Sequence, residues 1–148
     1  MGQHDGYADP RYGVKQTLVI PDKGATQTSA IASAVVIKRY TFMHNVKVTD
    51  WNVAFVVGGT QTGAAAASNF VQIGKSLAGT GAVSVIGSAA IGTQANNTVK
   101  DATVTETTFK TGDDLVVQYA AGTGLAAGVF QAGANVQYVE NYVHEDNQ

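Results

Sequence analysis

Cysteine is absent from the 148 residues, which excludes disulfide bonds and thiolate zinc sites. Stability must therefore come from packing or from contacts with partner subunits. Glutamate occurs only three times and leucine four times, whereas valine occurs 20 times and threonine 16 times. Because β-branched side chains lose rotamer freedom in a helix but pack well on a pleated sheet, this composition predicts strands rather than helices.

Charge is scarce as well, at 14% of the residues, with nine basic and eleven acidic side chains scattered along the chain. A formal net charge of −2 provides no basic surface for phosphate binding, so we expect no nucleic-acid partner. No apolar run approaches the ~20 residues of a membrane helix, and residues 1–6 lack the features of a signal peptide. We expect no membrane partner, and so little charge suggests a surface that other subunits cover.

The chain fits one domain with short extensions. Residues 1–15 show neither helical nor strand periodicity and are expected to form an extended N-terminal arm, while residues 144–148 form a polar tail. Residues 16–143 hold the expected strands, which lie at 17–20, 34–42, 46–57, 70–77, 82–86, 98–109, 115–119 and 134–143. A turn over Pro21–Gly24 is expected to end the first strand, with a loop over residues 25–34. Residues 63–68 could form one helical turn, and residues 78–81 a hairpin loop.

This succession of short strands favours an all-β fold, an antiparallel β-sandwich that is jelly-roll-like, over any parallel sheet. In residues 46–57 the odd positions Trp51, Val53, Phe55 and Val57 share one face, as in a strand with one side in a core. We expect the following residues inside the sandwich: Val53, Phe55, Val104, Leu115 and Val117.

No catalytic constellation is visible. The three histidines, His4, His44 and His144, fall in the arm, a turn and the tail, and none has a sequence neighbour that would complete a triad. We therefore predict that the chain is not an enzyme, and no motif indicates a cofactor. Trp51 with Tyr40 could form an aromatic platform for a sugar, but the face that Trp51 shares with Val53 and Phe55 favours core packing.

Three glycine-containing segments have simple turn interpretations. Gly112-Asp113-Asp114 before an apolar strand is ordinary turn chemistry, although Asp101, Asp113 and Asp114 could bind calcium if their loops converge. No EF-hand spacing supports such a site. Residues 79–81 and 122–124, each Gly-Thr-Gly, lack the Lys-Ser/Thr of a phosphate loop and are interpreted as hairpin glycines.

Several segments carry a family resemblance. The strand Trp51–Gly59, the segment Thr108–Leu115 before an apolar strand and the closing run Val136–Glu140, set among loops of small residues, resemble single-domain β-sandwich proteins of tailed bacteriophage particles. The resemblance covers residues 46–142 and is to capsid decoration (cement) proteins in particular. It implies a jelly-roll-like fold, assembly as a homotrimer on the outer capsid surface with the major capsid protein as partner, and no enzymatic activity.

Two other classes stay open. A tail-fibre or receptor-binding module would share the composition, and a carbohydrate-binding module would share the fold. The N-terminal arm carries Tyr7, Pro10, Arg11 and Tyr12, residues that can bury flat area or form hydrogen bonds at a partner surface. We expect this arm to clamp a neighbouring subunit or the capsid.

Overall fold

The computed structural model describes residues 14–27, 34–57, 70–91, 95–120 and 128–140. All elements in these ranges are strands, so the predicted all-β class is confirmed, and none of the described residues forms a helix that could cross a membrane. The strands are β1 (Gln16–Gln27), β2 (Val35–Thr41), β3 (Val46–Val57), β4 (Phe70–Ser76), β5 (Val83–Ala90), β6 (Thr98–Ala102), β7 (Thr107–Phe109), β8 (Asp114–Tyr119) and β9 (Gly128–Glu140).

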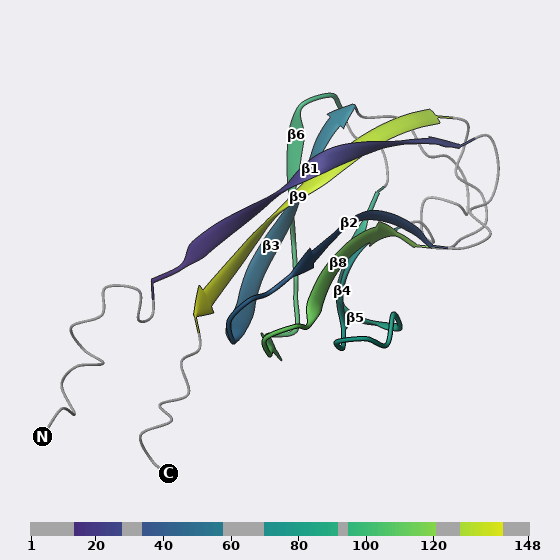
Figure 1. The fold of residues 1–148 in the computed structure, drawn as a ribbon. Helices are drawn as coiled ribbons and strands as arrows, with labels where there is room; N and C mark the ends of the chain where they lie inside the picture. The colour runs from purple at the N-terminus through teal and green to yellow at the C-terminus, as the bar shows by residue number, and fades with distance from the viewer. Residues whose placement is uncertain (1–13, 28–33, 58–69, 92–94, 121–127, 141–148) are drawn as a thin grey trace, which may run out of the picture.

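Two antiparallel sheets pack face to face, as Figure 1 shows. The five-stranded sheet has the order β1-β9-β3-β6, and β7 pairs with β3 beyond the end of β6; the four-stranded sheet has the order β2-β8-β4-β5. If β6 and β7 are taken as one interrupted strand, eight strands form two four-stranded layers in which early and late strands alternate. This is the strand order of a jelly roll, which confirms the predicted sandwich.

Several predicted strands have the expected limits. β3 has the predicted bounds, and β2 and β8 differ from the prediction by one residue at most. β4 and β5 form the predicted antiparallel hairpin, although β5 continues to Ala90 and does not end at residue 86. The loop between β4 and β5 has positive φ at Gly79 (76°) and Gly81 (70°), as expected of hairpin glycines.

The expectations for β1, β6 and β9 were wrong at their limits. β1 does not stop at a Pro21–Gly24 turn but continues to Gln27, because a bulge between Ile20 and Lys23 admits Pro21. An edge strand with a bulge tolerates proline, which cannot donate to a ladder. The strand expected at residues 98–109 is interrupted between Ala102 and Thr107, and β9 begins at residue 128 rather than 134.

Buried positions in β3 change parity along the strand. Val46 and Val48 are buried in its first half and Trp51, Val53 and Phe55 in its second half, because the pairing with β9 shifts by one residue between Val48 and Asp50. Of the residues expected inside, Val53, Phe55, Leu115 and Val117 are fully buried, whereas Val104 is partly buried against the core. Val57 is only half-buried.

One side of the sandwich is closed by the connection between β6 and β7. Trp51 Nε1 donates a hydrogen bond to the Thr103 carbonyl (2.9 Å), and the next residue, Val104, forms a bridge to Gly87 in β5. Thr105 N then donates to the Ile86 carbonyl (2.8 Å). The five-stranded sheet is therefore joined to the edge of the four-stranded sheet on this side.

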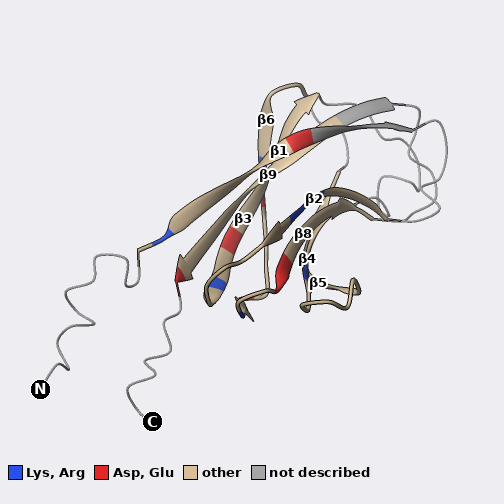
Figure 2. Ribbon diagram, viewed as in Figure 1, with Lys and Arg blue, Asp and Glu red and all other residues tan. Residues whose placement is uncertain are grey.

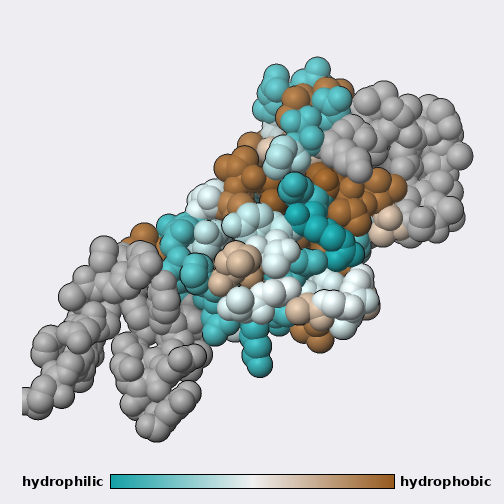
Figure 3. Space-filling view, viewed as in Figure 1, coloured by the Kyte–Doolittle hydropathy of each residue, from teal (hydrophilic) through white to brown (hydrophobic). Residues whose placement is uncertain are grey.

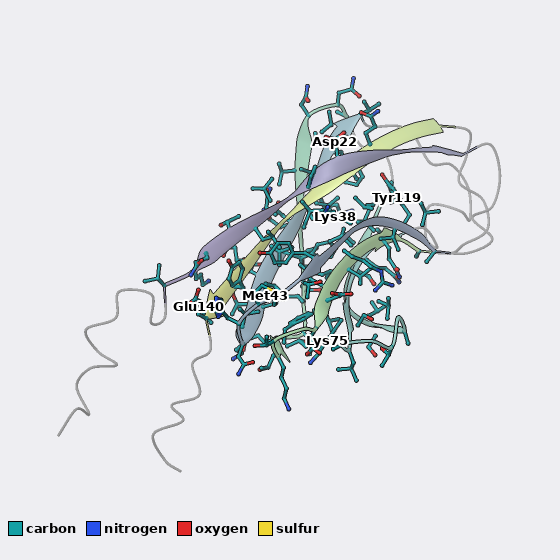
Figure 4. All side chains as sticks on the ribbon, in the orientation of Figure 1. Asp22, Lys38, Met43, Lys75, Tyr119 and Glu140 are labelled. Carbon is teal, nitrogen blue, oxygen red and sulfur yellow. The ribbon has the colours of Figure 1, made fainter. Side chains whose placement is uncertain are left out.

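Across the core, Tyr119 of β8 also links the two sheets. Its hydroxyl accepts a hydrogen bond from the Ala132 amide of β9 (3.0 Å), and Figure 4 shows Tyr119 between the layers. Burial raises the pKa of Tyr119 to about 12, although the hydrogen bond from Ala132 opposes the shift. The phenol is thus neutral at physiological pH and serves as a fixed acceptor.

We expect Gly87→Ala to destabilise the fold, because a Cβ atom would lie 2.7 Å from the Thr103 carbonyl oxygen, 2.9 Å from Ile73 Cγ2 and 3.0 Å from Trp51 Nε1. Crowding of this kind costs about 1–3 kcal/mol of unfolding free energy. Denaturant unfolding measures the loss, with Ser88→Ala, an exposed site on the same strand, as the matched control. Equal stability of the two variants would show that the closed side is not tightly packed.

Candidate interaction surface

The outer face of the five-stranded sheet carries two rows of side chains that the strand register places side by side. Residues that pair across an antiparallel ladder point to the same face, so each row runs from strand to strand. The first row is Val19, Asn135, Asn52 and Asp101, and the second is Gly133, Ala54 and Val99. Asn135 Nδ2 donates to Asn52 Oδ1 (2.9 Å) within the first row.

The second row begins with the small residues Gly133 and Ala54 and ends with the larger Val99, so the face is lowest over the first two residues. A hollow of about 170 Å³ lies over Ala54 and Gly133, and Val19 and Pro21 of β1 and Val56 of β3 line it. Only glycine fits at position 133, because a Cβ atom there would collide with the Ile20 carbonyl oxygen at the β1 bulge. The bulge therefore both raises one wall of the hollow and requires glycine in its floor.

The walls of this hollow are unusually apolar for an exposed surface. Val19 is 66% exposed, Val56 41% and Val99, across the sheet on β6, 61%. Figure 3 shows hydrophobic surface gathered over the β1 and β9 part of the molecule. We call the surface formed by Val19, Pro21, Ala54, Val56 and Val99 the valine face.

Among the side chains that the structure describes, the charged ones beside the valine face are acidic. Asp22 lines the hollow, and Asp101 is exposed on β6 in the neighbouring row; Figure 2 shows the acidic residue on β1. Lys47, on the same sheet toward the start of β3, forms an ion pair with Glu106. A partner for this face would therefore combine apolar groups with positive charge.

The arm residues expected to contact a partner, Tyr7, Pro10, Arg11 and Tyr12, lie outside the described residues, as do His4, His144 and residues 63–68 and 122–124. His44 is exposed between β2 and β3. Trp51 is only 2% exposed, which confirms the core packing favoured from the sequence and excludes Trp51 from a sugar-binding platform. Tyr40 packs edge-on against Phe42 at a ring separation of 5.3 Å.

The aspartates considered as calcium ligands have structural roles. Asp114 accepts a hydrogen bond from Thr41 (2.6 Å) and pairs with Arg39, whereas Asp101 lies on the other sheet. Within the described ranges, no three His, Cys, Asp or Glu side chains gather as metal ligands would. Asp113 belongs to the turn that the sequence predicts, where its Oδ2 accepts from the Lys110 amide (2.8 Å).

Asp113 also forms a buried ion pair that the sequence did not reveal. Lys75 Nζ lies 3.0 Å from Asp113 Oδ2 and donates to the Thr108 carbonyl (2.7 Å), and the Ala78 amide donates to Asp113 Oδ1 (3.3 Å). Burial alone would raise the pKa of Asp113, but hydrogen bonds from Lys110, Lys75 and Ala78 outweigh it and lower this pKa below its usual value. The pair joins the end of β4 to the turn before β8, which are distant in sequence, so no local pattern could identify it.

Comparison with known proteins adds fold-level matches only. No protein-family model matches, and no curated protein matches by sequence. The structure of infectious bursal disease virus strain Gx matches with a TM-score of 0.48 and 10% identity, over 88% of this chain and 34% of that chain. A mutant VP2 protein of the same virus, in derived T=1 particles, matches with a TM-score of 0.47 and 10% identity, over 87% of this chain and 32% of that chain. This chain thus spans about a third of those chains, and the jelly-roll assignment rests on its own strand order.

Stability should fall in acid because of Asp113. Folding lowers the pKa of Asp113, so the ionised carboxylate stabilises the folded state. This stabilisation is complete at pH values above the pKa of Asp113 in the unfolded chain, near 3.8, and is lost as the pH falls through the pKa in the folded chain. Asp113→Asn should cost about 1–3 kcal/mol at pH 7, and this difference from the natural protein should shrink between about pH 5 and pH 2. Urea unfolding at a series of pH values measures it. Asp101→Asn, exposed on β6, is the control, and an Asp113→Asn difference that does not change with pH would contradict the role of the pair.

Proposed function

We propose that this chain is a structural virion protein that binds the outer surface of a bacteriophage capsid and stabilises it, by packing and not by catalysis. The observation that carries the proposal is the valine face, an exposed apolar surface on an ordered sheet with little charge, which assembly on a particle would cover with the capsid or with another copy of the chain. Exposed apolar surface with a polar rim is typical of protein–protein contact sites. The major capsid protein is the partner that the resemblance of residues 46–142 to decoration proteins implies.

The fold agrees with this function without deciding it. Jelly rolls form viral capsid domains and also lectin domains, and one fold serves many functions. The exposed groups of the valine face are aliphatic and not aromatic, and the one tryptophan is buried. Since sugars are bound largely by stacking on exposed aromatic rings, the surface favours a protein partner over a carbohydrate.

The N-terminal arm is the second part of the proposal. Tyr7, Pro10, Arg11 and Tyr12 precede β1 and can contribute to an interface without contributing to the core, since β1 begins only at Gln16. A segment that becomes ordered on binding can cover a large surface, although the ordering reduces the affinity per unit area.

Co-sedimentation with capsids assembled without this chain tests the capsid-binding function. The full chain should pellet with such capsids, and deletion of residues 2–13 should weaken binding at least tenfold, equivalent to ~1.4 kcal/mol. The thermal midpoint of the isolated domain should change little, because the deletion ends before β1. A full chain that stays in the supernatant would exclude decoration, whereas equal binding by the truncated chain would exclude only the clamp.

Self-association should be visible without capsids. We expect a homotrimer of about 46 kDa, three times 15.3 kDa, in light scattering at micromolar concentration. The apolar valine face gives the physical reason, since its association removes exposed apolar area from water. A monomeric mass at these concentrations would contradict the trimer.

A further inference from the structure

We infer that the valine face is the docking site for the N-terminal arm of a second copy of this chain, with Pro10 and Tyr12 in the hollow and Arg11 at its rim. This inference rests on the self-association in the proposed function but not on capsid binding. It joins two features of the proposed function: an apolar groove on the described part of the chain, and an aromatic- and proline-bearing segment that precedes β1.

The shape of the face suits an extended segment. Its floor is small, at Ala54 and Gly133, and its walls are Val19 and Pro21 on one side and Val99 on the other. β1 and β6 are three strand spacings apart in the sheet, about 14 Å, so a single extended chain can lie between them. In an extended chain, residues two apart point to the same side. Pro10 and Tyr12 can therefore both face the floor.

The charge of the occupant complements the rim. Arg11 is the one charged residue among Pro10, Arg11 and Tyr12, and the charged side chain that lines the hollow is Asp22. An isologous contact between two valine faces would place acidic groups against each other, which is unfavourable. An arm that carries arginine between two apolar residues avoids this repulsion and adds an ion pair at the edge.

An arm that places Tyr12 beside Val56 must come from another copy, because Tyr12 of the same chain can reach Val19 at the near end of the hollow but not Val56. Gln16, at the start of β1, pairs with Tyr138 of β9. Lys23 of β1 and Phe55 of β3 both pair with Ala132, which is six residues and about 20 Å from Tyr138 along β9. Val56 follows Phe55 in β3, which lies two strand spacings, about 10 Å, from β1. The offsets along and across the sheet together place Val56 about 22 Å from Gln16. Tyr12 is four residues from Gln16 and reaches at most ~14 Å. Figure 4 shows this separation: Glu140 lies near the start of β1, and Asp22, which lines the hollow, lies far from it along the strand.

The lack of native cysteine makes disulfide trapping a direct test. Full-length Gly13→Cys, which keeps Pro10, Arg11 and Tyr12, is mixed with full-length Val56→Cys under mild oxidation. A cross-linked pair of two 15.3 kDa chains should form at least roughly tenfold more than with Val85→Cys, because docking creates a millimolar effective concentration. Val85 is the matched control, a valine 47% exposed on the four-stranded sheet.

Two further variants separate specific docking from collision. Tyr12→Ala added to Gly13→Cys should reduce trapping at Val56→Cys several-fold, since it removes one apolar anchor. Gly13→Cys and Val56→Cys combined in one chain should give linked oligomers and no internally bridged monomer, because a disulfide requires Cα atoms within ~7 Å. Circular dichroism melts confirm that each variant is folded.

Each remaining outcome has a definite meaning. Equal trapping at Val56→Cys and Val85→Cys, or an internally bridged monomer, would overturn the inference. A trimer that gives no link to Val56→Cys would also overturn it, because the arm would then lie elsewhere. Capsid binding without trapping defeats only this inference, whereas trapping without capsid binding defeats only the decoration function.

Discussion

The hydrogen bond from the Trp51 indole to the Thr103 carbonyl determines how the two sheets meet. A buried indole N–H must find an acceptor, and here the acceptor lies in the connection that leaves the five-stranded sheet and bridges to β5. This contact explains the interruption between β6 and β7, and it explains why Gly87 has no side chain. With that side of the sandwich closed, β1 and β2 remain as the outer strands, and a bulge on each makes them poor templates for further pairing.

A second constraint acts around Ala132 and Gly133 in β9, where both flanking strands shift register. The shifts between Ile20 and Lys23 in β1 and between Phe55 and Val57 in β3 fall beside the same two residues. Toward the core, the Ala132 amide donates to Tyr119 and joins the sheets. Toward solvent, the displaced backbone of β1 forms the wall of the hollow over Gly133. One local irregularity thus supplies both an inter-sheet hydrogen bond and the hollow on the outer face.

The sequence predicted strands with a clear local pattern well but did not predict where their pairing shifts. β3, with apolar alternation from Trp51 to Phe55, and the β4–β5 hairpin, marked by its glycines, were predicted from local pattern alone, although the register shifts in both were not. The full length of β1 was not predicted, because the one extra residue of its bulge interrupts the period and Pro21 resembles a strand end. The valine face could not be predicted either, since it depends on the register between strands far apart in the chain. The Lys75–Asp113 pair likewise could not be predicted, because it joins the end of β4 to the turn before β8 and no local sequence pattern links these two segments.

Strand geometry separates the residues that hold this protein together from those that are available to a partner. In β3, Val53 and Phe55 face the core, while Ala54 and Val56 face solvent, so alternate positions of one strand serve the two purposes. A change at the outer positions can alter binding while the core stays packed. Conversely, a partner that binds the outer face of the folded chain, and does not bind the unfolded chain, stabilises the whole sandwich by mass action. For a chain with no disulfide and few charges, the proposed contact between copies would then add stability as well as drive assembly.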